Sequence, residues 1–533
     1  MHLTIDDVYG RIGHFGNRQK IYFFVLCSLN GWCAFHQLLT VFVGLDPTFK
    51  CYEKNASSAA EPLINKCINN DPQECRISYT SEYKSFASEW NLICGEKYKV
   101  ALVQSVWMGG VMTGALVLGS VADVIGRLKT LMVSILGTIA FEGFSAFAPT
   151  LMIMIGLRFL GGVCCALVIL VSFVLSQELI GTSWRSFCGM CVAMVFAIGI
   201  GIYSWLASTM SDWRTLTLVC SLSGIVFLLL PCYVPESPRW LVTQGRNDEA
   251  KVILEDMAKK NQKSKELPSH WEVKSSGGKN KDKKSNGVRD LVSHPYVLLL
   301  TLIQIFSWFV NSCTYYGLTM AASNLGGDVY VSTALSGLIE IPACITAAAV
   351  IDRVGRRITL CTAMLLGGTA CICIQFIPVK YVTVITGLAL CGKLSISASF
   401  SVAYVHSAEI FPTIIRNSAV GIVSVAARVG GIVAPFILML GDYIPNMQFT
   451  VFGIMTFLAG MMNLKLPETL GQPMPENIAD VIAFRNNEKV VKSGKKYQKL
   501  KMLDEEVGAE TVRPRTPTKK GEVGEDQEPL LEE

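Results

Sequence analysis

Charged residues are scarce in this chain. Only 17% of its 533 residues are Asp, Glu, Lys or Arg, whereas 51% are hydrophobic and the mean hydropathy is +0.41. Soluble globular domains carry about 25% charged residues, so this composition excludes that class and indicates an integral membrane protein. The net charge of +5 does not indicate a nucleic-acid partner, because the Lys and Arg residues lie between apolar runs and in the tails.

The residue patterns of enzymes and of metal sites are also missing. The glycine clusters carry no P-loop lysine, no cysteine and histidine spacing is typical of a metal site, and no nucleophile lies near a base. A cleaved signal peptide is not expected, because Arg11, Arg18 and Lys20 precede the first apolar run and no cleavage site follows it. We therefore predict no enzyme activity, no cofactor, no metal and a retained first helix.

Apolar runs of about 20 residues, the length that crosses a bilayer core, recur along the sequence. We expect about twelve membrane-spanning helices and hence an all-α membrane protein. The expected spans are 21–43, 100–121, 131–148, 152–176, 187–208, 216–234, 296–320, 332–351, 358–378, 382–405, 415–440 and 447–466.

Basic residues favour one orientation of these spans. They cluster in the connections after the even-numbered spans, whereas the alternate short connections carry little beyond Arg214 and Lys380. Because positively charged loops stay in the cytoplasm, we expect both termini there and the long 44–99 connection outside. The clustered residues are Arg127, Lys129, Arg185, the lysines of 246–289, Arg353, Arg356, Arg357 and Arg416.

The 44–99 connection has the features of an extracellular segment. It contains four cysteines and a glycosylation sequon at Asn55. An oxidising and glycosylating compartment accounts for both features, so we expect two disulfides and a glycan on Asn55. The three possible pairings stay open. The cysteines are Cys51, Cys67, Cys75 and Cys94.

Three short motifs occur twice, at separations of 229 to 232 residues. Such agreement indicates a duplicated chain with two similar halves. The motif pairs are Asp123–Arg127 with Asp352–Arg356, Glu178–Arg185 with Glu409–Arg416, and Pro235–Ser237 with Pro467–Thr469. The expected parts are a cytoplasmic N-terminus at 1–20, six-helix halves at 21–241 and 296–470, a cytoplasmic linker at 242–295 and a disordered cytoplasmic tail at 471–533.

The first two repeated motifs contain groups that can act as conformational latches at helix ends. An Asp, a Gly that allows a tight turn and a nearby Arg can bind a neighbouring helix end in one conformation and release it in another. The alternative, that the basic residues only anchor helices to lipid headgroups, does not explain the retained spacing. The predicted latch residues are Asp123, Gly126, Arg127, Glu178, Arg185, Asp352, Gly355, Arg356, Glu409 and Arg416.

Several segments resemble a known transporter family. The segments GSVADVIGRLK (119–129), RFLGG (158–162) and PESPRWL (235–241) resemble signature loops of the major facilitator superfamily. The segments SEWNLIC (88–94), GLIEIP (337–342) and AEIFPTIIRN (408–417) narrow this to the organic cation, anion and carnitine transporters of solute carrier family 22.

This resemblance implies a major facilitator fold with two six-helix halves around a central cavity. It also implies that a small organic ion crosses the plasma membrane by alternating access between the two sides. Membrane lipid and a coupling ion, sodium or a proton, are further candidate partners.

Polar residues within the apolar spans are the substrate-site candidates, because such groups are costly in lipid. In the seventh span Trp308, Asn311 and Tyr315 share one helix face, and the tenth span repeats this with Lys393 and Ser397. We expect these stripes to face a central cavity, although single members could instead form hydrogen bonds between helices. The remaining candidates are Tyr316 in the seventh span and Asn30 and Gln37 in the first.

Two charges within the spans bear most on the substrate. A charge at the centre of a membrane helix costs about 2.5 to 3.5 kcal/mol even on lenient scales, yet Glu340 lies in the eighth span and Arg428 in the eleventh. The resemblance implies that cation and carnitine carriers share the acid, whereas anion and carnitine carriers share the arginine. Together they favour a zwitterion, with Arg428 on its carboxylate and Glu340 on its positive group or on a coupling cation. The alternative is an ion pair between Glu340 and Arg428 that neutralises both charges.

Three functions remain open at this point. The leading prediction is a secondary-active transporter of carnitine-like or betaine-like zwitterions, and also of organic cations. An organic anion exchanger would use Arg428 and leave Glu340 structural. A membrane protein that serves trafficking or protein interaction without transport is the third, and the intact latch motifs and polar stripes argue against it.

Overall fold

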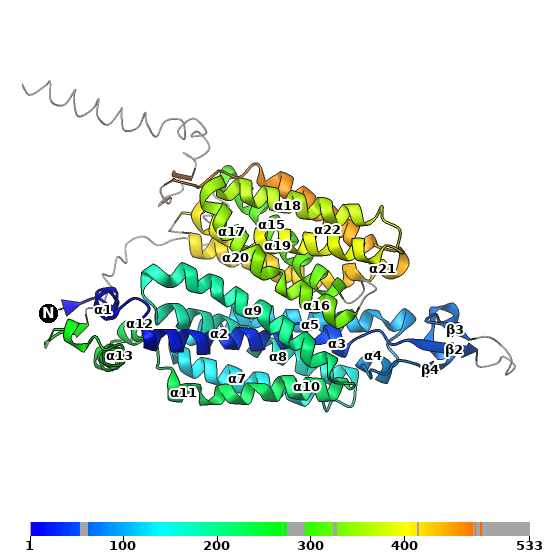
Figure 1. The fold of residues 1–533 in the computed structure, drawn as a ribbon, viewed down its shortest axis with the longest axis horizontal. Helices are drawn as coiled ribbons and strands as arrows, with labels where there is room; N and C mark the ends of the chain where they lie inside the picture. Colours follow the sequence, from blue (N-terminus) through cyan, green and yellow to red (C-terminus); the bar gives the residue numbers. More distant parts are fainter. Residues whose placement is uncertain are drawn as a thin grey trace, which may run out of the picture. The chain divides into compact units, whose positions relative to one another are not determined.

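A computed structural model describes residues 2–53, 62–268, 270–273, 291, 294–322, 328–412, 415–472, 475 and 480–481. The chain divides into two compact units, Met1–Asn477 and Ile478–Glu533, and every element named below belongs to the first. Figure 1 shows the helices that dominate this unit.

The helices are listed here in chain order. Those of the first half and linker are α1 (Ile5–Ile12), α2 (Asn17–Gln37), α3 (Leu39–Val43), α4 (Phe86–Glu89), α5 (Tyr98–Thr113), α6 (Val121–Ile125), α7 (Arg127–Ser145), α8 (Leu151–Glu178), α9 (Arg185–Ser208), α10 (Trp213–Leu222), α11 (Leu230–Tyr233), α12 (Pro238–Thr243) and α13 (Asn247–Lys260). Those of the second half are α15 (Pro295–Ala321), α16 (Val329–Leu338), α17 (Glu340–Val354), α18 (Arg356–Ile374), α19 (Val382–Ile410), α20 (Arg416–Leu438), α21 (Leu440–Tyr443) and α22 (Met447–Asn463). Helix α5 continues through a π-helical turn at Gly114–Leu118, and a 3-10 segment at Ser223–Leu229 joins α10 to α11.

The helices have the lengths that a membrane protein requires. Within the described residues, eleven helical stretches are long and apolar enough to cross a bilayer, and α22 is a shorter apolar helix of 17 residues. Each of the twelve predicted spans overlaps one of these twelve stretches. The predicted all-α membrane architecture is therefore confirmed.

Helices α5 and α8 pack closely through glycines. A Cβ atom at Gly110 would lie 2.2 Å from the carbonyl oxygen of Phe159, and one at Gly162 would lie 2.4 Å from the carbonyl oxygen of Trp107. Neither position can therefore accept a side chain without movement of a backbone. In lipid, where no hydrophobic force draws helices together, such close backbone contact is what stabilises a helix pair.

Contacts between the two halves gather near the 44–99 loop, where α5 packs on α20 and α9 on α16 (Figure 1). The Lys97 Nζ atom at the start of α5 lies 2.6 Å from Asp46 and 2.7 Å from Asp442 of the other half. The Ser105 hydroxyl donates to the carbonyl oxygen of Ile432 at 2.7 Å. The loop end of the helix bundle is thus tied together by charged and polar contacts as well as by packing.

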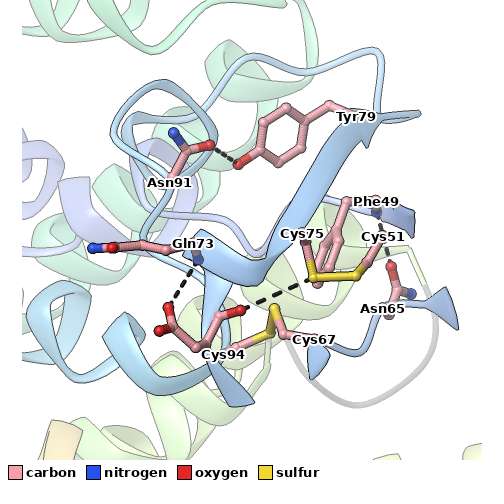
Figure 2. The surroundings of a disulfide bond; sticks show 10 residues. Phe49, Cys51, Asn65, Cys67, Gln73, Cys75, Tyr79, Asn91 and Cys94 are labelled. Carbon is pink, nitrogen blue, oxygen red and sulfur yellow. Dashed lines mark hydrogen bonds between the residues drawn. A yellow bond between two sulfur atoms is a disulfide. The ribbon is translucent and has the colours of Figure 1, made fainter. Parts of the chain in front are cut away.

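The 44–99 loop carries a small sheet with strands in the order β3 (Leu63–Ile64), β2 (Phe49–Glu53), β4 (Cys75–Tyr79), all antiparallel neighbours. The predicted cysteines form two disulfides, Cys51–Cys75 and Cys67–Cys94 (Figure 2). The first joins the paired strands β2 and β4. The predicted glycosylation site Asn55 lies outside the described residues.

The N-terminus and the start of the linker pack together. Strand β1 (His2–Leu3) pairs in parallel with β5 (Glu272–Val273), and α1 lies against α13. Leu254 and Met257 of α13 are fully buried. The Asp6 carboxylate of α1 forms an ion pair with Arg239. The first part of the predicted linker is therefore a packed element.

Candidate functional site

Glu340 begins helix α17 at a break in the eighth span. Helix α16 ends at Leu338, and Pro342 has no amide hydrogen to offer the Leu338 carbonyl group. The GLIEIP segment therefore lacks one backbone hydrogen bond at the turn that carries Glu340, although the backbone remains helical through Ile339. The Glu340 side chain is only 8% exposed.

The ammonium group of Lys393, on α19, lies against this carboxylate. Its Nζ atom is 2.9 Å from Oε1 of Glu340, 2.5 Å from the Thr319 hydroxyl and 3.2 Å from the centre of the Tyr315 ring. The Tyr315 hydroxyl donates to the same Glu340 oxygen at 2.7 Å. Glu340 thus has a buried cationic partner, supplied by a residue 53 positions away in the sequence.

Aromatic rings extend from this cluster toward more open space. The Phe400 ring lies 5.9 Å from the Tyr315 ring and 5.5 Å from the Tyr404 ring, measured between centres. Tyr404 is 44% exposed and lies 4.4 Å from Trp308. Faces of such rings attract ammonium groups, so they suit a path for a cationic group toward Glu340.

Two candidates of the seventh span bind across the seam between α15 and α19. Trp308 donates from Nε1 to the Ser407 hydroxyl at 2.9 Å, and Ser399 donates to Oδ1 of Asn311 at 2.5 Å. Both candidate side chains are buried. These contacts fit the alternative of hydrogen bonds between helices. The hydroxyl of Ser397, also on α19, is buried without a partner among the described residues.

Arg428 lies on α20, three residues before Gly431, where a Cβ atom would lie 3.2 Å from the Tyr316 ring. Its buried Nε atom has no hydrogen-bond partner in the described part of the chain. The alternative ion pair between Glu340 and Arg428 is not formed, since Glu340 is paired with Lys393. Arg428 is therefore a partly buried cation without an acidic partner among the residues described here.

The two candidates of the first span have different settings. Asn30 donates from Nδ2 to the Ser172 hydroxyl at 3.2 Å, inside the first half. Gln37 donates from Nε2 to the Tyr316 hydroxyl at 2.7 Å and so joins the two halves. Gln37 and Tyr316 lie where a movement of the halves would change their contact.

A second buried ion pair, which the sequence analysis did not identify, lies in the first half. Arg158 on α8 donates from Nη1 to Oε2 of Glu142 on α7 at 2.7 Å, and both side chains are 0% exposed. Trp107 donates to the other Glu142 oxygen at 2.9 Å. A Cβ atom at Gly161 would lie 2.4 Å from Glu142, which explains the first glycine in RFLGG. Arg158, a charged residue next to an apolar run, was the sequence feature that could have indicated this pair.

The first copy of the latch motif forms an ionic cluster. Arg127 lies 2.6 Å from Asp123 and 3.4 Å from Glu178. Arg185 lies instead 4.0 Å from Asp6. The structure thus brings three of the predicted residues together and places Arg185 beside the N-terminal helix.

The second copy repeats this arrangement. Arg356 lies 3.0 Å from Asp352 and 3.1 Å from Glu409. The Nε atom of Arg416 donates to the carbonyl oxygen of Phe411 at 3.2 Å. Among the described residues, the ion pairs of Arg127 and of Arg356 each stay within their own half, and that of Arg185 reaches the N-terminal helix.

Two glutamates of the third repeated motif were missed as site residues. Glu236 accepts from the backbone amide of Arg127 at 3.0 Å, and Glu468 accepts from that of Arg356 at 2.8 Å. A carboxylate from a distant segment therefore caps the start of α7, and an equivalent one caps α18. The repeat of Pro-Glu-Ser as Pro-Glu-Thr was the signal that could have identified them.

The motif glycines leave the space for these caps. Gly126 has φ +116° and Gly355 has φ +107°, in the region that favours glycine. A Cβ atom there would lie 2.7 Å from Glu236 or 2.6 Å from Glu468. Glycine is thus required at both positions for a second reason besides the tight turn, because a carboxylate approaches the backbone there.

Comparison with known proteins identifies the family. The sequence profile described as "Sugar (and other) transporter" matches residues 48–479. The chain is 34% identical over 516 residues to "Organic cation transporter protein" of Drosophila melanogaster, with 89% of this chain and 94% of that protein covered. It is 35% identical over 483 residues to "Solute carrier family 22 member 15-like" of Xenopus laevis, with 90% and 96% covered. The chain belongs to solute carrier family 22 of the major facilitator superfamily.

Further comparisons agree with the assignment of this chain to solute carrier family 22. "Organic cation/carnitine transporter 2" of Homo sapiens is 28% identical, with 90% of this chain and 94% of that protein covered. The solved structure of the xylose transporter XylE from E. coli in an inward open conformation has a TM-score of 0.58 at 18% identity, covering 85% of this chain and 97% of that chain. The chain is thus a multi-pass membrane transporter with the major facilitator fold. Among the described residues no group of three or more His, Cys, Asp or Glu side chains is placed to hold a metal ion.

Proposed function

We propose that this chain transports small organic zwitterions, such as carnitine-like or betaine-like amines, and also organic cations. It does so by secondary-active alternating access across the plasma membrane, with both termini and the linker in the cytoplasm. The disulfide-bonded 44–99 loop and the basic connections support this orientation.

The observation that carries the substrate class is that two adjacent residues lie near groups of opposite charge. Tyr315 is hydrogen-bonded to Glu340, and the ring of its neighbour Tyr316 lies against Gly431, three residues after Arg428 on α20. A small zwitterion carries its two charges only a few bonds apart, so it suits such a site. The guanidinium fork of Arg428 can hold a carboxylate, and Glu340 with the Tyr315 ring can hold an ammonium group.

One observation favours an organic anion exchanger as the second candidate. With Glu340 paired to Lys393, the charge left over at the site is the positive charge of Arg428. A simple carboxylate would neutralise it without any rearrangement of the pair. The two candidates differ in whether Glu340 takes part in substrate binding.

Uptake of three probes by the wild type and two variants tests the proposal. We would express wild type, Arg428→Ala and Glu340→Gln in cells and measure uptake of labelled carnitine, tetraethylammonium and benzoate, with and without sodium. We expect Arg428→Ala to lose carnitine and spare tetraethylammonium, because only the former has a carboxylate left unpaired. We expect Glu340→Gln to weaken both ammonium probes. An unchanged rank order of the three probes in both variants would refute the zwitterion proposal.

The latch clusters have a proposed role in the same cycle. We propose that the clusters around Arg127 and Arg356 hold helix ends in one conformation and release them in the other. The hydrogen bonds that cap α7 and α18 support this role, because they fix the helix starts on which the arginines lie. Replacing Arg127 should then slow turnover more than it weakens substrate binding.

A further inference from the structure

Lys393 occupies the position that a substrate ammonium group would need. Its Nζ atom contacts the Glu340 carboxylate, the Thr319 hydroxyl and the face of the Tyr315 ring. A carboxylate, a neutral oxygen and an aromatic face are together the environment that binds an ammonium group. At 3.2 Å from the ring centre, Nζ covers this face of Tyr315, so no second cation can use it at the same time.

We propose that Lys393 is a tethered substitute for the substrate's ammonium group, which a bound cation or zwitterion displaces from Glu340. The proposal rests on the proposed function, since it requires a substrate with a positive group. The flexible four-carbon stem of lysine suits such a displacement, because it lets the ammonium group move without a movement of α19. Tyr315 keeps its hydrogen bond to Glu340 in either case.

Because Lys393 takes the place of the substrate's ammonium group, Glu340 also has a cationic partner in the empty transporter. A carrier that returns empty across the membrane must reorient with Glu340 buried and without substrate. A buried carboxylate without a partner is strongly unfavourable, and Lys393 supplies the partner during that step. In the loaded carrier the substrate's ammonium group supplies it. Lys393 therefore permits net transport, whereas exchange of one substrate molecule for another does not require it.

The variant Lys393→Met separates these two activities. We would reconstitute the full chain in vesicles and measure carnitine and tetraethylammonium uptake, once into empty vesicles and once into vesicles preloaded with the same probe. We expect net uptake to fall by about tenfold, because the unpaired carboxylate opposes empty return. We expect exchange to persist and the apparent affinity for tetraethylammonium to rise by about tenfold, because the internal competitor is gone.

Two further variants complete the test. Glu340→Gln combined with Lys393→Met removes both charges of this pair, so no carboxylate is left unpaired and net uptake should recover while the preference for ammonium probes is lost. Lys380→Met is the matched control, since Lys380 also lies over a tyrosine ring, 4.9 Å from the centre of Tyr381, but is exposed. It should leave both activities unchanged.

Three results would overturn the inference. The first is a proportional loss of net uptake and exchange in Lys393→Met without a gain in affinity. The second is retained ammonium preference in the double variant, which decides the matter even where Lys393→Met fails to fold. The third is wild-type transport of benzoate alone, which refutes the proposed function itself. The first leaves the proposed function intact, whereas the second also contradicts the proposed contact of the substrate with Glu340, so the failures are distinguishable.

Discussion

The two halves of this transporter each bury one carboxylate with one cation, and they surround it differently. Glu142 and Arg158 in the first half are 0% exposed and lie 2.7 Å apart. Glu340 and Lys393 in the second half lie 2.9 Å apart, with the Glu340 side chain 8% exposed. The first pair uses the rigid fork of arginine, whereas the second uses the flexible stem of lysine.

The residues around the two ion pairs also differ, with polar contacts around Arg158 and aromatic rings around Lys393. The Arg158 guanidinium also donates to the His36 carbonyl oxygen and to the Thr40 hydroxyl, so it ties α8 to α2 and α3 as well as to α7. Around Lys393 the neighbours are aromatic rings that lead to the exposed Tyr404. A pair sealed on every side acts as a brace, and a pair at the end of an aromatic path is placed to meet a ligand.

The largest expected effect comes from breaking the sealed pair. Arg158→Ala leaves Glu142 buried and unpaired, and we expect it to destabilise the protein by about 3–5 kcal/mol. Lys393→Met should cost less, because the Glu340 side chain is 8% exposed whereas the Glu142 side chain is fully buried. Thermal unfolding in detergent and the amount of protein at the cell surface measure both. Equal losses in the two variants would contradict the contrast between brace and site.

A smaller effect is expected from crowding the brace. Gly161→Ala places a Cβ atom 2.4 Å from Glu142, and we expect about 1–3 kcal/mol of destabilisation from overpacking. Gly156→Ala on the same helix is the matched control. No atom lies within 4 Å of a Cβ atom there, so the higher helix propensity of alanine should slightly stabilise α8. The unfolding temperatures of the two variants measure the difference, and a similar shift in both would count against the steric argument.

The latch glycines test a feature that the halves share. Gly126→Ala and Gly355→Ala each force an unfavourable φ and a contact with a capping glutamate, at an expected cost of about 1–3 kcal/mol. Because both copies have the same geometry, we expect similar losses of transport rate in the two variants. Uptake rates normalised to surface protein measure this, and a loss confined to one variant would show that the copies are not equivalent.

The smallest expected effect concerns the N-terminal helix. The hydrogen bond from Arg239 lowers the pKa of Asp6 below its usual value of 3.8, although partial burial opposes this. The pair therefore stabilises the docked helix fully above about pH 4 and loses this contribution as the pH falls through the lowered pKa. The effect is below about 1 kcal/mol because the pair is largely exposed. Proteolysis of the N-terminus should become faster at low pH in wild type, and Arg239→Ala should reduce that pH dependence, since Arg185 remains 4.0 Å from Asp6.

The sequence predicted the local parts of this structure well. Apolar run length gave the spans, and the repeated spacing identified Arg127 and Arg356 as bound to nearby acids, because residues four apart on a helix share a face. Four cysteines in one loop indicated two disulfides, although their pairing depends on which strands lie together.

The missed parts depend on contacts between distant segments. Lys393 was a candidate for the substrate, but nothing in α19 alone reveals that it pairs with Glu340 on α17. The same holds for Glu236, whose carboxylate reaches the start of α7 from a segment more than one hundred residues later. Composition and periodicity describe one helix at a time, whereas these pairs are fixed by how helices pack.

The close packing of α5 on α8 at Gly110 and Gly162 affects which inherited changes this transporter tolerates. Every amino-acid replacement of glycine adds at least a Cβ atom, and at Gly110 and Gly162 that atom would meet a backbone oxygen of the facing helix. Any missense change in either codon is therefore expected to disturb helix packing, whatever the chemistry of the new side chain. We expect variation across a population to be depleted at these codons and ordinary at Gly156, where the space is open.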